Sequence, residues 1–267
     1  MKLRMASADI SKTPGDAPQP GFYAGTSGWA YPTWKPGFYP AKLPAAKFLE
    51  HYASRLNTVE VNYTFRKLCT APQLQKWLDA TPPEFRFSFK APQSITHLRR
   101  LRECGDELTA FVASLAPVVA AGKQAALLFQ FPPNFRAAAV GKDKRNHQEA
   151  LVEFLRDAAK LFKTAKWRAA IEFRDASWFT DQTYAAMRES NVALCQAESD
   201  NFTTPFVTTA DYHYTRMRCS DYTESRLSEA FQQMWTQSKQ APEFVYFMHE
   251  DAPTGPLRAE NLLQRIP

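Results

Sequence analysis

Residues 22–29 read FYAGTSGW, a short β-rich run that ends in a turn containing Gly25 and Gly28. In an open, doubly wound α/β sheet, the first strand leads into a G-x-G-x-x-G turn that holds a phosphate. This turn lacks that pattern, and a tight bend with close backbone approach explains its glycines better. The stretch therefore favours the other large α/β architecture, the closed barrel.

The rest of the chain alternates short β-rich runs with stretches of helical periodicity. Strands are predicted at 22–27, 58–65, 86–91, 125–131, 167–173, 192–198, 212–218 and 243–249. Helices are predicted at 44–56, 72–80, 105–121, 147–163, 180–190, 224–238 and 257–265. The alternation predicts an α/β fold, a single (β/α)₈ TIM-type barrel over residues 21–267, preceded by a flexible polar tail at 1–20.

The composition suits one large core, because 45% of the 267 residues are hydrophobic. The N-terminal residues lack the apolar segment of a signal peptide, and no run approaches the roughly 20 apolar residues that span a bilayer. We therefore expect no membrane partner. The four cysteines are far apart and form no C-x-x-C, which argues against a disulfide framework and favours a reducing, cytoplasmic location.

The chain is mildly basic, with a net charge of +6 and a pI of about 9.1. This charge fits either an ordinary basic surface or a nucleic-acid partner. The densest basic cluster is 97–102, and a second cluster at 142–145 contains an acid. Both are too short to be a nucleic-acid-binding tail, so nucleic-acid binding remains an alternative.

Polar side chains gather near the C-terminal ends of the predicted strands, where the active sites of such barrels lie. Residues two apart in a strand share a face. The polar face carries Glu60, Asn62, Ser88, Lys90, Gln130, Glu172, Arg174, Gln196, Glu198, Arg216 and Arg218, and the last strand ends at His249. The opposite faces are apolar and are expected to contact the helices.

Charges inside a barrel must pair, reach water or bind a ligand. One interpretation is an ion network that closes the top of the barrel. The other is a cation-rich pocket for a phosphate or carboxylate, with Glu60 and Glu172 as acid/base residues. In that pocket Lys90 is either an anion partner or a Schiff-base lysine. A glycosidase mechanism with two carboxylates also stays open, because sequence does not reveal their separation.

Metal and serine chemistry are weakly supported by the sequence pattern. His97, His213 and His249 have no close ligand spacing, although Glu172 and Glu198 are available as further ligands. Ser27 lies on a turn flanked by Gly25 and Gly28, but the chain has no G-x-S-x-G elbow. We therefore predict no metal site and assign no cofactor.

The loop after the first strand is rich in aromatic residues and is expected at the mouth of the barrel. Trp29, Tyr31 and Trp34 either stack on a planar ligand or pack together as a hydrophobic lid. Thr26 and Ser27 precede this loop and are candidate ligand contacts.

Several separate motifs resemble the YecE-like family, domain of unknown function 72. They are YAGTSGWAYPTWKPGFYP, LNTVEVNYTF, FRFSFKAP followed by ITH, LLFQFPPNF, IEFRDASWF and, near the end, FMHEDAPTGPLRAENL. The resemblance implies a TIM-type barrel similar to those of xylose isomerase and endonuclease IV, without an established reaction. Its motif residues here are Gly25, Thr26, Ser27, Gly28, Trp29, Glu60, Asn62, Lys90, His97, Gln130, Glu172 and Arg174.

Two positions depart from the family pattern. Arg218 stands where strand seven of the family often has His, and Met248-His249 stands where strand eight often has Asn-Asn. These departures put a shared mechanism, and a metal role for strand seven in particular, in doubt.

The combined prediction is a hydrolase or lyase that acts on a small anionic or phosphate-bearing substrate. Nucleic-acid binding or processing, and ligand binding without catalysis, are the alternatives; no oligomeric state is assigned. The predicted catalytic residues are Glu60, Lys90 and Glu172. The predicted substrate contacts are Thr26, Ser27, Trp29, Tyr31, Asn62, His97, Gln130, Arg174, Glu198, Arg216, Arg218 and His249.

Overall fold

The computed structural model describes residues 21–138, 146–248 and 251–266. The predicted tail at 1–20, the basic cluster at 142–145 and His249 lie outside these residues. The strands are β1 Phe22–Ser27, β2 Thr58–Val61, β3 Arg86–Lys90, β4 Gln124–Gln130, β5 Arg168–Glu172, β6 Ala193–Leu194, β7 Gln196–Ser199, β8 Phe202–Thr203, β9 His213–Met217 and β10 Glu243–Phe247.

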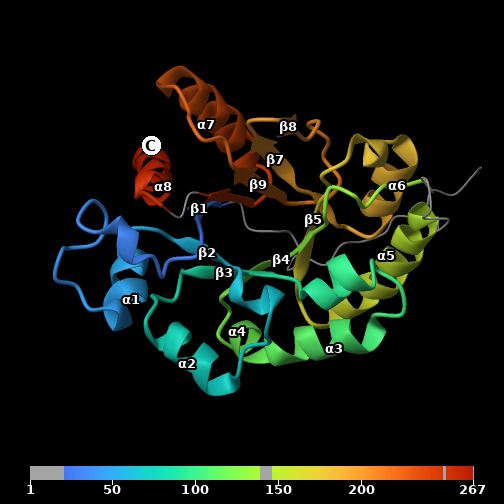
Figure 1. The fold of residues 1–267 in the computed structure, drawn as a ribbon, viewed down its shortest axis with the longest axis horizontal. Coiled ribbons are helices and arrows are strands. Elements are labelled where there is room, and N and C mark those ends of the chain that lie inside the picture. The colour runs from blue at the N-terminus through green and yellow to red at the C-terminus, as the bar shows by residue number, and fades with distance from the viewer. Residues whose placement is uncertain (1–20, 139–145, 249–250, 267) are drawn as a thin grey trace, which may run out of the picture.

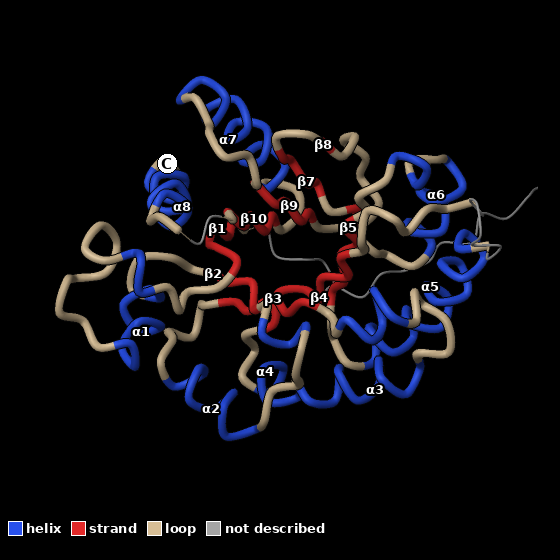
Figure 2. Tube along the Cα trace, viewed as in Figure 1, coloured by secondary structure: helices blue, strands red, loops and turns tan. Residues whose placement is uncertain are grey.

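The sheet closes on itself through one interrupted strand. Its order is β6-β5-β4-β3-β2-β1-β10-β9-β7-β8, and only Cys195 separates β6 from β7. β6 pairs in parallel with β5, whereas β7 pairs in parallel with β9. Figure 2 shows the resulting inner ring of strands with helices outside it. The predicted TIM-type barrel is confirmed, with residues 192–198 forming two short strands and β8 added as an antiparallel partner of β7.

Helices cover the outside of the ring (Figure 1). They are α1 Phe48–Ala53, α2 Ala71–Asp79, α3 Gly105–Ser114, α4 Ala116–Ala120, α5 His147–Thr164, α6 Asp181–Glu189, α7 Glu224–Ser238 and α8 Thr254–Gln264. The predicted helix at 105–121 is divided at Leu115, because Pro117 cannot donate the backbone hydrogen bond that would continue it. Within the described ranges, every helix is too short or too polar to cross a bilayer.

The barrel interior combines small residues on some strands with aromatic residues on others. Ala126 and Ala170 lie in the same buried cluster as Tyr212, Tyr214 and Tyr246. Large and small side chains fill such an interior without voids. A second, larger apolar layer lies between the strands and the helices.

This packing corrects the predicted orientation of residues 192–198. Ala193, Cys195 and Ala197 face the interior, where their small side chains fit beside the tyrosines. Gln196 and Glu198 therefore point outward, and both line a pocket against α7. The prediction that these two polar residues face the mouth is wrong. The tyrosines inside the barrel leave space for small side chains, so the alanines and the cysteine of this segment face inward.

The first residue of β10, Glu243, is fully buried. One carboxyl oxygen accepts a hydrogen bond from Thr215 Oγ1 at 2.8 Å, and Oε2 has no partner in the described part of the chain. Burial raises the pKa of Glu243 to about 8, although the Thr215 hydrogen bond opposes this rise. The carboxyl group is thus largely protonated in the folded protein at neutral pH.

We expect Glu243→Gln to raise the free energy of unfolding by about 1–2 kcal/mol at pH 8. The wild-type protein loses stability as pH rises from the unfolded-state pKa of about 4.5 to the folded-state value of about 8. The difference between variant and wild type should therefore grow across this window and then level off. Urea denaturation at several pH values measures it, with exposed Glu153→Gln as the control. A difference independent of pH would contradict the prediction.

Candidate functional site at the barrel mouth

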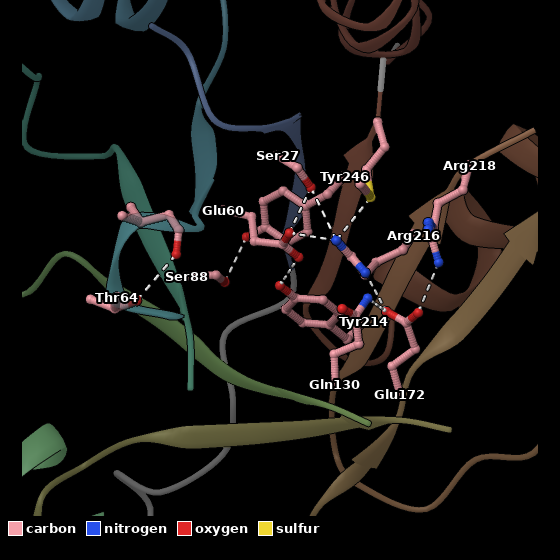
Figure 3. Close-up of polar contacts among 12 residues, drawn as sticks. Ser27, Glu60, Thr64, Ser88, Gln130, Glu172, Tyr214, Arg216, Arg218 and Tyr246 are labelled. Atoms are coloured by element: carbon pink, nitrogen blue, oxygen red, sulfur yellow. Dashed lines mark hydrogen bonds and ion pairs between the residues drawn. The ribbon is translucent and has the colours of Figure 1, made fainter. Parts of the chain in front are cut away.

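Arg216 lies at the centre of the charged cluster, with a side chain that is only 1% exposed. Its Nη1 donates to Glu172 Oε2, and its Nη2 donates to Glu60 Oε1 at 2.9 Å. Figure 3 shows Arg216 between the two carboxylates. Since these residues belong to β9, β5 and β2, the two ion pairs connect three strands across the barrel.

Neutral donors complete the shell around the buried Glu60 carboxylate. Ser27 Oγ donates to Oε1 at 2.6 Å, and the Tyr214 hydroxyl donates to Oε2 at 2.7 Å. Burial raises the pKa of Tyr214, and the neighbouring Glu60 raises it further, so the phenol keeps its proton. Both Glu60 oxygens are therefore occupied within the protein.

The Glu172 carboxylate is also completely engaged. Oε2 accepts from Gln130 Nε2 at 2.9 Å in addition to Arg216, while Oε1 accepts from Arg174 at 3.0 Å and Arg218 at 3.1 Å. Burial alone would raise the pKa of Glu172, but the three arginines outweigh it and hold the value at about 2. Glu172 is therefore an anion at neutral pH and a weak base.

A pocket of about 400 Å³ lies above this network. Its lining comes from the strand ends, the turn after β2 and the residue after β10: Asn62, Tyr63, Phe65, Arg66, Lys90, Gln130, Arg174, Arg216 and Met248. Among these described lining residues there are four cationic side chains and no carboxylate. The wall of the pocket is therefore electropositive, although two carboxylates are buried beneath it.

Lys90 is held at this wall by its backbone and by an aromatic ring. Its carbonyl oxygen accepts a hydrogen bond from Thr64 Oγ1 at 2.7 Å, and its Nζ lies 4.3 Å from the centroid of the Phe65 ring. Within residues 21–138, 146–248 and 251–266, Nζ makes no hydrogen bond or ion pair. Burial lowers the pKa of Lys90 to about 8, and Arg216 lowers it as well, against weaker opposition from Glu60 and Glu172.

The turn after β2 supplies pocket residues that the sequence analysis missed. The predicted strand at 58–65 ends at Val61, and a 3₁₀ turn follows at Tyr63–Phe65. This turn brings Tyr63, Phe65 and Arg66 to the rim, and Met248 joins them from the end of β10. The sequence signal for this turn was the polar Asn62, which interrupts the apolar run. In the structure, Asn62 Oδ1 is buried and has no hydrogen-bond partner in the described chain.

The structure brings together most of the predicted site. The residues in contact around the two carboxylates or at the pocket wall are Ser27, Glu60, Asn62, Lys90, Gln130, Glu172, Arg174, Arg216 and Arg218. Their catalytic and binding roles remain predictions.

Thr26 and Glu198 are among the predicted contacts that lie elsewhere. The Thr26 hydroxyl is buried and lies within hydrogen-bond distance of Gly28 O, at 2.7 Å, and of the Tyr52 hydroxyl on α1, at 3.0 Å. Glu198 accepts a hydrogen bond from Arg226 on α7, at 2.9 Å from Nε. Both side chains therefore hold outer elements onto the barrel, which corrects their predicted position in the pocket.

The aromatic loop after β1 packs on the protein itself. Trp34 is buried and contacts Tyr39, while half-buried Trp29 meets Trp77 of α2 edge to face, with 5.1 Å between ring centroids. Tyr31 donates a hydrogen bond to Ser27 O at 2.9 Å. These contacts match the hydrophobic-cluster alternative, and none of these rings lines the pocket beside Lys90.

The histidines and basic residues are dispersed. His97 Nδ1 lies 2.9 Å from Thr96 Oγ1, and its ring meets the Phe65 edge, beyond the pocket lining. His213 begins β9, at the opposite end of that strand from the mouth. Arg99 pairs with Glu107 at 2.6 Å. Among the residues described, no three His, Cys, Asp or Glu side chains form a group suited to a metal ion.

A sequence model described as "Protein of unknown function DUF72" matches residues 23–267. The UPF0759 protein YunF of Bacillus subtilis (strain 168) is 30% identical over 180 residues, which are 66% of this chain and 57% of YunF. The chain thus spans just over half the length of this relative.

Two solved structures share the barrel. A DUF72 family protein from Thermotoga maritima MSB8 matches with a TM-score of 0.75 at 25% identity, over 91% of this chain and 98% of that one. A family 2 AP endonuclease from Brucella melitensis matches with a TM-score of 0.56 at 11% identity, over 92% and 99% of the two chains. The second likeness concerns the fold alone.

Proposed function

Because the chain belongs to the DUF72 family, which carries no assigned reaction, we propose a function from the barrel mouth: it binds a small anionic molecule there and acts on it as an enzyme. The substrate class is a carboxylate or a phosphate-bearing compound. The supporting observation is the pocket lining, in which Arg66, Lys90, Arg174 and Arg216 meet no lining carboxylate in the described chain. Such surfaces favour anions through charge-assisted hydrogen bonds.

In this proposal the two glutamates position cations and are not free bases. Glu172 stays ionised because its pKa is about 2, and its four donors leave little capacity to accept a substrate proton. Glu60 is enclosed by Ser27, Tyr214 and Arg216. Both carboxylates fix the guanidinium of Arg216 at the pocket floor, which is the preorganisation that anion recognition requires.

A second candidate function, ligand binding without catalysis, is favoured by the same complete pairing of both carboxylates. Turnover assays with phosphate esters and oxo acids separate the two candidates. Binding of a compound that the protein leaves chemically unchanged would favour the non-catalytic function.

We expect Arg66→Ala to weaken the binding of inorganic phosphate by about tenfold, because this exposed rim residue supplies one charge to the pocket. Isothermal titration calorimetry at low ionic strength measures the effect. Arg156→Ala is the matched control, since Arg156 is 68% exposed on α5 and contacts Asp157 outside the pocket. Equal phosphate affinity in both variants, or no binding by the wild-type protein, would contradict the proposed anion site.

A further inference from the structure

We propose that Lys90 is a nucleophilic amine that forms an imine with the carbonyl group of a small oxo acid or oxo-phosphate. This inference rests on the proposed anion-binding function and adds a reactive group to it. Two features of the pocket select this class of ligand. One is an amine without a partner among the described residues, which suits a carbonyl group, and the other is a set of arginines, which suits an anionic group.

The cations around the mouth differ in their partners. Arg174, Arg216 and Arg218 all donate to Glu172. Among the described residues, Lys90 Nζ contacts the Phe65 ring, at 4.3 Å from its centroid, and shares no carboxylate. A purely structural cation would be expected to share this carboxylate. Lys90 instead lines the pocket, where the proposed reaction brings its amine to a carbonyl carbon.

A second buried lysine shows what a structural role looks like in this fold. Lys123 Nζ donates to Leu78 O at 2.8 Å, Thr81 O at 2.7 Å and Thr81 Oγ1 at 3.0 Å. All three ammonium donors are used, and they hold the C-terminal end of α2. Burial lowers the pKa of Lys123 as well as that of Lys90, so the two differ mainly in hydrogen bonding and location.

Protonation supports the reactivity of Lys90. With a pKa of about 8, about half of the Lys90 amines are neutral at pH 8, compared with less than about 1% for an ordinary lysine. Among the described residues, the charged or titratable groups that interact electrostatically with Lys90 or line the same pocket are Glu60, Arg66, His97, Glu172, Arg174 and Arg216. His97 has a lowered pKa because of burial and of Lys90 itself, so it is neutral well below pH 8. Among these groups at the pocket, Lys90 is therefore the one expected to titrate near pH 8.

The chemistry needs no further reactant. The neutral Nζ attacks the carbonyl carbon and forms a C–N bond, while a proton moves from nitrogen to the carbonyl oxygen. The resulting carbinolamine loses water as its C–O bond breaks, and the imine remains. Nothing is oxidised or reduced. The protonated imine withdraws electrons from the neighbouring carbon, which suits cleavage or formation of a bond at that carbon.

The pocket is large enough for these reaction steps and contains a polar group, Asn62. The pocket volume of about 400 Å³ fits a small molecule. Asn62 lines the same pocket, and its Oδ1 makes no hydrogen bond to any described residue. Arg174 and Arg66 remain at the wall for the carboxylate or phosphate.

The test uses pyridoxal 5′-phosphate as a chemical reagent with an aldehyde and a phosphate, and pyridoxal as the matched aldehyde without phosphate. Adducts are reduced with borohydride and located by peptide mass spectrometry. We expect the phosphate-bearing reagent to label Lys90 at least about tenfold faster than Lys123. Labelling should rise with pH and level off above about pH 8, and inorganic phosphate should slow it. Lys90→Arg should lose this adduct while retaining the circular dichroism spectrum of the wild-type protein.

The outcomes separate this inference from the proposed function. Phosphate binding by calorimetry without preferential labelling of Lys90 would overturn the nucleophile and leave the anion site standing. Rapid labelling of Lys90 by both reagents, with no phosphate binding, would support the nucleophile and overturn the anion site. Equal labelling of Lys90 and Lys123 would overturn the special reactivity of Lys90.

Discussion

Replacing Arg216 by Met should lower the free energy of unfolding by about 3–5 kcal/mol, because it removes the shared partner of two fully buried carboxylates. Of the donors in the described chain, Glu172 would keep Arg174, Arg218 and Gln130, whereas Glu60 would keep the hydroxyls of Ser27 and Tyr214. The main cost is therefore expected at Glu60.

Equilibrium denaturation with urea measures this loss. The double variant Arg216→Met/Glu60→Gln should recover part of it, since the unpaired charge is then absent. Arg156→Met is the matched control and should stay within about 0.5 kcal/mol of the wild type, because its ion pair is exposed. Wild-type stability of Arg216→Met would show that the network contributes nothing net to folding.

The same network predicts the direction of acid sensitivity. The folded-state pKa of Glu172 is about 2, below its ordinary value of 4.5. A depressed pKa stabilises the folded protein above pH 4.5, and this contribution is lost as pH falls toward 2. In Arg216→Met the loss on acidification should be smaller, because one cation that depresses the pKa of Glu172 is gone.

The second large effect is expected for Gly25→Ala in β1. A Cβ at this position would lie 1.9 Å from Thr58 O in β2 and 2.8 Å from the Tyr52 hydroxyl. That hydroxyl accepts from Thr26 N at 2.8 Å and donates to Thr58 O at 2.9 Å. The methyl group would therefore separate two barrel strands and disturb the hydrogen bonds that join them to α1.

We expect this substitution to cost about 3–5 kcal/mol, seen as a lower urea midpoint and a lower Tm. Gly105→Ala is the control, because a Cβ there meets no atom within 4 Å and the residue begins α3. That variant should equal or slightly exceed the wild-type stability. If Gly25→Ala were as stable as Gly105→Ala, the close approach of β1 and β2 would be refuted.

The sequence was sufficient for the barrel because each strand is marked independently by a short apolar run. It was not sufficient for the inner face of residues 192–198. Polar Gln196 and Glu198 imitate the pattern of the other strand ends, but the tyrosines of neighbouring strands leave room only for Ala193, Cys195 and Ala197. The polarity pattern of one strand does not reveal how large the side chains of the other strands are inside the barrel.

The sequence placed the charged residues of the cluster at strand ends but did not predict how they pair. Glu60, Glu172 and Arg216 were identified from their strand positions, yet 156 and 44 residues separate Arg216 from its two partners. Only the folded distances show that one guanidinium serves both carboxylates. The rim was missed for a local reason: the backbone turns at Asn62, so Phe65 and Arg66 leave the strand that periodicity assigned to them.

The buried ion network and the exposed pocket rim belong to different parts of the chain, and this separation has an evolutionary consequence. Glu60, Glu172 and Arg216 maintain the shape of the barrel, whereas Tyr63 and Arg66 are exposed residues that contact the pocket from the turn after β2. Exchanges at the rim would change which molecule is recognised at little thermodynamic expense. Under the proposed function, the choice of ligand can thus change at the rim while the buried ion network stays as it is.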